Sequence, residues 1–182
     1  LYYEGEMQQK MRKKVCELLV IMMIFAAVSG FYGCSGRDEM EDPEENPYDT
    51  NIDAGALAEY LADRITFADE LTKVDNDIAY EIYGIEESAV SDIAVYMSTG
   101  ATAEEIAVLT VKDDEGALLA GTAFNSRIES QKGGFENYVP EEIPKLENAV
   151  ITQIDSAVVM IVCADTDEAE QAVDSYISEY LE

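Results

Sequence analysis

Hydrophobic and polar positions repeat with two different periods from residue 54 onward. A period of three to four residues is typical of helices that bury one face. It occurs in four segments, which span residues 54–65, 74–85, 113–138 and 165–181. Asp75 or Asn76 is placed to cap the second segment, which Gly84 ends, and Asp165 with Glu168 fits a capping box for the last.

Alternation with a period of two, or an unbroken apolar run, predicts strands. The strand segments span residues 92–98, 104–112, 148–154 and 157–163. Small residues between the first two predict a hairpin, and Asp155 and Ser156 form a tight turn between the last two. The last run is apolar on both faces, which predicts a central strand.

The order of these elements is two short helices followed by strand, strand, helix, twice over. This order predicts an α+β domain with an antiparallel sheet of about four strands and helices packed on one face. The long helix at 113–138 contains Gly116, Gly121, Gly133 and Gly134. Each interior glycine costs about 1 kcal/mol relative to alanine, so we expect a helix with weak points.

A different pattern occupies residues 1–33. Basic residues at 10–14 precede an uncharged apolar run at 18–28, and small and aromatic residues follow it. This is the arrangement of a secretory signal, and the run is shorter than the roughly 20 apolar residues that span a membrane. We therefore predict a signal peptide over residues 1–33, with cleavage after Gly33.

Residues 31–34, Phe-Tyr-Gly-Cys, resemble the lipobox of bacterial lipoproteins, in which a small residue precedes a cysteine. The resemblance implies that Cys34 receives a diacylglyceryl group and becomes the mature N-terminus. Two acyl chains anchor a protein stably, which predicts a location on the extracytoplasmic face of the cell membrane. The alternatives are an ordinary secreted protein and a protein with a single membrane span.

Acidic residues dominate the chain after the leader. Residues 34–182 hold 7 Lys and Arg against 36 Asp and Glu, a formal charge of −29. Such a surface repels phosphodiesters, so we expect no nucleic-acid partner. Residues 35–53 contain eight acids and two prolines. They have little to bury, which predicts an acidic, disordered tether over 34–53 and a single domain over 54–182.

The tether contains one candidate metal site. Asp49, Asn51 and Asp53 have the alternate spacing of a calcium loop, but Ala54 stands where that loop needs glycine and Tyr60 where it needs glutamate. We favour Asp53 as the N-cap of the following helix and expect no metal or cofactor.

Candidate catalytic chemistry is limited by the amino acids that the chain lacks. It contains no histidine, which excludes serine and cysteine triads and the common zinc sites. Cys163 lies in an apolar strand and is expected to be a small core residue. Paired acids such as Glu104 and Glu105 could serve a glycosidase, but nothing in their pattern separates them from a strand's solvent edge. We therefore expect no enzyme activity.

Two residues are candidates for weak binding. Arg127 is one of the few bases in an acidic domain. It either pairs locally with Glu129 or Glu136, which we favour because such salt bridges are common, or binds the carboxylate of a ligand or partner. Tyr138 either packs at the end of the long helix, which we favour, or contributes to a binding surface.

Three segments of the chain resemble the domain-of-unknown-function family 4358, small lipoproteins of Gram-positive bacteria, many from the gut. The segments are YMSTGATAEEIAVLTVKD, RIESQKGGFENYVPEEIPKLENAVI and VVMIVCADTDEAEQAV. The resemblance covers about residues 57–181 and rests on residues 100–105, Arg127, Tyr138, Pro140 and residues 146–149. It implies a lipoprotein leader and brings no established activity, cofactor or partner.

Two classes of function remain. We favour a non-catalytic interaction or sensing module, held at the cell surface by lipid on Cys34. It predicts an exposed apolar or mixed patch for an unidentified protein partner. The alternative is a protein that binds a small cation or sugar, or a hydrolase that uses carboxylates. It predicts a concave pocket with clustered acids.

Overall fold

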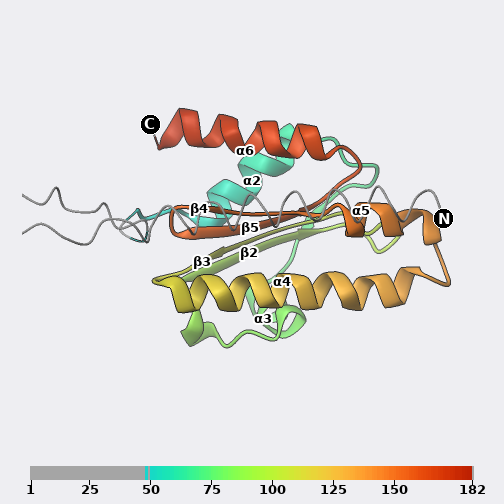
Figure 1. Cartoon of the computed structure of the whole chain (residues 1–182), viewed down its shortest axis with the longest axis horizontal. Helices are drawn as coiled ribbons and strands as arrows, with labels where there is room; N and C mark the ends of the chain where they lie inside the picture. The colour runs from blue at the N-terminus through green and yellow to red at the C-terminus, as the bar shows by residue number, and fades with distance from the viewer. Residues whose placement is uncertain (1–47, 49, 182) are drawn as a thin grey trace, which may run out of the picture. The chain divides into compact units, whose positions relative to one another are not determined.

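The computed structural model describes residue 48 and residues 50–181, all of which belong to the unit Glu44–Glu182. An antiparallel sheet of five strands lies between two layers of helices (Figure 1). The elements in chain order are α2 (Ala54–Arg64), β1 (Thr72–Lys73), α3 (Asn76–Tyr83), η1 (Glu87–Ala89), β2 (Asp92–Met97), β3 (Glu105–Thr110), α4 (Asp114–Phe135), η2 (Pro140–Glu142), α5 (Ile143–Glu147), β4 (Val150–Ile154), β5 (Ala157–Val162) and α6 (Thr166–Tyr180).

The sheet has the strand order β1-β2-β3-β5-β4. Both predicted hairpins are present, and β5 is an interior strand whose residues are all buried, as its unbroken apolar run indicates. The α+β class and the repeated strand, strand, helix order are thereby confirmed. The fifth strand is β1, which has two exposed residues paired with the end of β2. So short a strand has no periodicity that a sequence could reveal.

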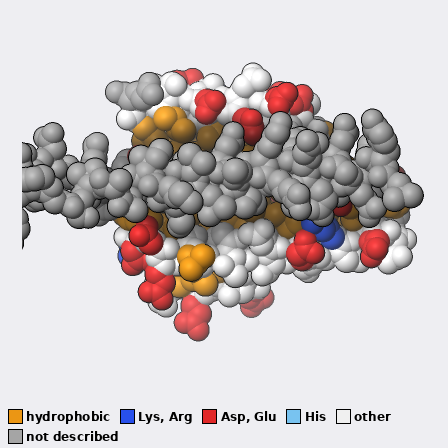
Figure 2. Space-filling view, in the orientation of Figure 1, with side chains coloured by type: hydrophobic (Ala, Val, Ile, Leu, Met, Phe, Trp, Pro, Cys, Tyr) orange, Lys and Arg blue, Asp and Glu red, His pale blue; other side chains and the backbone are white. Residues whose placement is uncertain are grey.

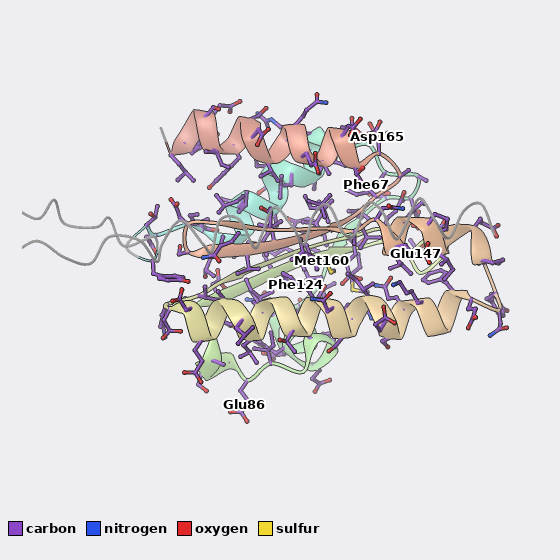
Figure 3. All side chains as sticks on the ribbon, in the orientation of Figure 1. Phe67, Glu86, Phe124, Glu147, Met160 and Asp165 are labelled. Carbon is purple, nitrogen blue, oxygen red and sulfur yellow. The ribbon has the colours of Figure 1, made fainter. Side chains whose placement is uncertain are left out.

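Helices cover both faces of the sheet, so the prediction that they pack on one face is wrong. Strand β3 shows why, because Ile106 and Val108 pack toward α2 and α6 while Ala107 and Leu109 pack toward α3 and α4. A strand that is apolar on both sides requires cover on both sides. Figure 3 shows Phe124 and Met160 in the layer between α4 and the sheet.

Aspartates cap three of the helices. Asp53, Asp113 and Asp165 each accept hydrogen bonds from backbone N–H groups in the first turn of α2, α4 and α6. The cap predicted for Asp165 is confirmed, but the carboxylate of Glu168 accepts from the backbone N and the Oγ1 of Thr66. The side chain predicted to complete a local box therefore joins α6 to the loop after α2.

The folded region begins before residue 54. Ile52 is buried in the core under α2 and α6, and the carbonyl of Thr50 accepts a hydrogen bond from Ser156 at 2.5 Å. The last residues of the segment that composition assigns to a tether are thus part of the fold. The leader, Gly33, Cys34, residues 35–47 and Asp49 lie outside the described residues.

Helix α4 runs without a break for 22 residues, so its glycines do not interrupt it. Gly116 packs closely, because a Cβ at this position would lie 3.0 Å from the Cβ of Val111, which would have to shift slightly. A Cβ at Gly121, Gly133 or Gly134 would meet no atom within 4 Å. Across residues 48 and 50–181, no helix combines the length and the apolar character that crossing a membrane requires.

Candidate functional site

A cavity of about 350 Å³ opens between the C-terminal part of α4 and the turn that joins β2 to β3. We call this cavity the α4 pocket. Its apolar wall comes from Met97 at the end of β2, Phe135 at the end of α4, and Tyr138 and Val139 just beyond it. Helix α5 lies at the same end of the sheet as the end of α4 (Figure 1). The volume is at the lower end of the range for small-molecule sites.

Glu105 forms the polar floor of the α4 pocket, and its side chain is only 1% exposed. Arg127 donates to it from Nη2 at 2.8 Å and from Nε at 3.2 Å. Gln131 Nε2 and the hydroxyl of Tyr83 also donate to this carboxylate. Every oxygen of Glu105 is therefore held by donors of the protein itself.

This arrangement corrects two predictions. Arg127 does not pair with Glu129 or Glu136, because it lies on the face of α4 that packs against the sheet and meets Glu105 there. Glu105 is buried and not at a solvent edge, since β3 is covered on both faces. A sequence separation of 22 residues hides such a pair from any search for neighbouring charges.

The electrostatics of this cluster favour a fixed ion pair. Burial alone would lower the pKa of Arg127, but the hydrogen bond and charge of Glu105 raise it above its ordinary value. Burial and then the negative charge of Glu105 raise the pKa of Tyr83 well above its ordinary value. At neutral pH Arg127 is thus a cation and Tyr83 a neutral donor.

Glu104 holds a second, separate cluster. It is also buried, and it accepts hydrogen bonds from Lys145 at 3.0 Å and from the backbone N–H groups of Ala68 at 2.8 Å and Asp69 at 3.0 Å. Burial alone would raise the pKa of Glu104, but Lys145 and these amides outweigh it and lower the pKa. Glu104 is therefore an ionised structural anchor, and its expected place at a solvent edge is wrong.

Two further carboxylates hold the turn that forms one wall of the pocket. Glu142 accepts from the backbone N–H of Ala103 at 2.9 Å and pairs with Lys145 at 2.9 Å. On the other side, Asp69 accepts from the backbone N of Thr99 at 3.0 Å and from its hydroxyl. The turn is thus fixed from both sides, so the α4 pocket is formed without a ligand.

Tyr138 lies at the rim of the α4 pocket with 90% of its surface exposed. The prediction that it packs at the helix end is wrong, because α4 ends at Phe135 and the chain turns there. Arg127 and Tyr138, the two candidate binding residues, therefore line the same cavity. They are eleven positions apart in the sequence, and the turn after α4 places Tyr138 at the cavity that Arg127 lines.

Gln131 and Gly134 also line the pocket, and the sequence did not mark either as a binding residue. Residues 127, 131 and 134 follow helical spacing, so they share one face of α4. Gly134 is exposed and, like Gly121 and Gly133, has open space where a side chain would begin. Gln131 is 9% exposed, and its Oε1 has no hydrogen-bond partner among the described residues.

Other reactive groups do not contribute to the α4 pocket. Cys163 is buried, as predicted, and burial raises the pKa of its thiol to about 11. Such a thiol is almost entirely protonated at neutral pH and is a poor nucleophile. Within residues 48 and 50–181, no group of three or more acids and cysteines is placed to hold a metal ion.

Comparison with known proteins gives one match. The family described as "Domain of unknown function (DUF4358)" matches residues 64–163, a range that contains every residue of the α4 pocket. Neither the curated proteins nor the solved structures include a match to this chain.

Proposed function

Because this chain belongs to the DUF4358 family, whose description names no activity, we propose its function from the α4 pocket. The protein is a non-catalytic sensing module that binds a small ligand there. It acts on the extracytoplasmic face of the cell membrane, where lipid on Cys34 holds it. The leader pattern before Cys34 supports the location, and the geometry of the pocket supports the binding role.

The observation that carries the binding role is the cavity at the C-terminal end of α4, where Gly134 is an exposed lining residue. The face of α4 that carries Arg127 and Gln131 is buried along most of its length, yet at Gly134 it opens onto a preformed cavity. A cavity that combines an apolar wall with a few convergent polar groups is the usual form of a ligand site.

The carboxylates of the site favour binding over catalysis. Glu105 is held by Arg127, Gln131 and Tyr83, and Glu104 by Lys145 and backbone amides. Both carboxylates line the α4 pocket, but donors from different segments of the protein hold each of them, so neither is free to act on a substrate as the acids of a glycosidase do. A catalytic acid or base also needs a proton that can reach the substrate, and these carboxylates are occupied.

Two variants of α4 test the binding role. Gly134 lines the cavity and Gly133 does not, so we expect leucine at Gly134 to narrow the cavity and leucine at Gly133 to leave it unchanged. We expect ligands to raise the Tm of the wild type and of Gly133→Leu, and to leave that of Gly134→Leu unchanged. The expected ligands are cell-wall fragments, calcium chloride and basic peptides serve as cationic comparisons, and the protein is purified from membranes. Equal shifts in both variants would exclude the α4 pocket as the site.

The location is tested by the intact mass of the protein purified from membranes. We expect a chain that begins at Cys34 and carries a diacylglyceryl group, and no such species from Cys34→Ala. An unmodified chain that retains residues 11–33 would contradict lipid anchoring. That result would leave the binding role of the pocket intact, since the lining residues all lie between Met97 and Val139.

A further inference from the structure

We propose that the ligand of the α4 pocket is a neutral molecule that presents a carboxamide to Arg127 and Gln131. This inference rests on the proposed binding role and adds the chemistry of the ligand. The carbonyl oxygen of the carboxamide accepts from Arg127, and its N–H donates to Gln131. The apolar part of the ligand lies against Phe135 and Tyr138.

The charges around the pocket exclude strongly charged ligands. Arg127 already has Glu105 as its counter-ion, with 2.8 Å between Nη2 and Oε2, so the floor of the pocket is close to neutral. An anion would have to compete with Glu105 and would enter the field of a chain with a formal charge of −28. Acidic side chains are scattered over the face shown in Figure 2, and basic ones are few.

A cation is disfavoured by what it would meet in the pocket. Glu104 and Glu105 are buried, and protein donors occupy both carboxylates. Three ionised side chains line the pocket, Glu104, Glu105 and Arg127. Arg127 is the one of these three that remains exposed to solvent, at 18%. A cation entering the pocket would therefore face a guanidinium and no free carboxylate, which leaves neutral ligands as the favoured class.

The hydrogen-bonding groups at the floor select the kind of neutral ligand. Arg127 uses Nε and Nη2 on Glu105, and its side chain lines the pocket and remains 18% exposed, so a ligand can reach it. Gln131 uses Nε2 on Glu105, which leaves Oε1 as an acceptor without a partner. An unpaired buried acceptor is destabilising, and a donor on the ligand would remove this penalty. A carboxamide supplies one acceptor and one donor at adjacent atoms, which matches this pair of groups.

The size and wall of the pocket limit the rest of the ligand. A volume of about 350 Å³ holds one sugar ring or one amino-acid residue rather than a long chain. Phe135 and Tyr138 provide aromatic surface beside the polar floor. The same carboxamide chemistry occurs in an acetamido sugar and in an amino-acid amide, and the experiment separates these two sources.

The test is a binding titration of the full chain, followed by the NMR signals of the Gln131 side-chain amide and the Arg127 Nε. The neutral probes are N-acetylglucosamine and N-acetylglycinamide. Their charged counterparts are glucosamine, which carries an ammonium group, and N-acetylglycine, which carries a carboxylate. Each probe is titrated into the wild type, Gly134→Leu and the matched control Gly133→Leu.

We expect at least one neutral probe to shift both signals and to bind at least tenfold more tightly than its charged counterpart. Binding should weaken at least tenfold in Gly134→Leu and stay unchanged in Gly133→Leu. Preference for the sugar or for the glycinamide identifies the source of the carboxamide. Arg127→Lys keeps the positive charge beside Glu105 but removes the second guanidinium nitrogen, so we expect it to weaken neutral probes about tenfold.

Two results would overturn the inference in different ways. If a charged probe binds as tightly as its neutral counterpart and loses affinity in Gly134→Leu, the pocket is a ligand site but the carboxamide assignment is wrong. If no probe distinguishes Gly134→Leu from Gly133→Leu, the assignment and the proposed binding role both fail.

Discussion

Replacing Arg127 with methionine should destabilise the protein more than replacing any other charged residue of α4. The substitution keeps an unbranched, flexible side chain but removes the guanidinium cation that faces Glu105. The carboxylate then retains only Gln131 and Tyr83 as donors, in a site where it is 1% exposed. Breaking one partner out of a buried pair costs about 3–5 kcal/mol, because it leaves an uncompensated charge.

The structure places the expected cost at the lower end of this range. Two neutral donors remain on Glu105, so we expect Arg127→Met to lose about 3 kcal/mol of unfolding free energy. For a domain of this size, such a loss lowers Tm by roughly 10 °C. Removing the other partner by Glu105→Gln should lower the free energy of unfolding by less. The Arg127 side chain is 18% exposed, so solvent can compensate its charge.

The assay is urea unfolding of Arg127→Met, Glu105→Gln and the double variant, analysed as a double-mutant cycle. Lys132→Met is the matched control, because Lys132 pairs with Glu129 on the exposed side of the same helix. Such exposed pairs contribute under about 1 kcal/mol. A loss for Arg127→Met no larger than that of Lys132→Met would show that Arg127 and Glu105 do not form a buried, coupled pair.

The order of secondary structure could be predicted from the sequence because its signals are local. Asp53 and Asp165 cap helices as their positions indicate, and Gly84 ends α3 in the left-handed conformation that glycine favours. Strand β5 is interior, as an unbroken apolar run predicts. These features depend on residues within a few positions of one another.

The layer arrangement and the pocket depend on contacts between distant segments. Strand β3 is apolar on both faces, as β5 is. Two adjacent strands of this kind predict helices on both faces of the sheet. Arg127 was recognisable as an unusual base, but its partner Glu105 lies on another element. From the sequence, Gly134 was expected only to weaken α4. Its position in the lining of the α4 pocket is known from the structure.

Two further predictions concern the glycines of α4 and the second buried carboxylate. Gly133→Ala should stabilise the protein by up to about 1 kcal/mol, because the new Cβ meets no atom and the helix gains propensity. Gly116→Ala should destabilise it by about 1–3 kcal/mol, since its Cβ would lie 3.0 Å from that of Val111. Thermal melts decide both, and a gain in Tm for Gly116→Ala would contradict the packing argument. Glu104 should make unfolding pH-dependent, because Lys145 and two backbone amides lower its pKa in the folded state despite its burial. Its contribution is therefore complete above the ordinary glutamate pKa of about 4.3 and is lost as the pH falls below that value toward the lowered folded pKa. Urea unfolding between pH 7 and pH 3 should show a steeper loss of free energy for the wild type than for Glu104→Gln. Glutamine at position 104 does not titrate. If the free energy of unfolding falls with pH equally in the wild type and in Glu104→Gln, other carboxylates govern the acid stability.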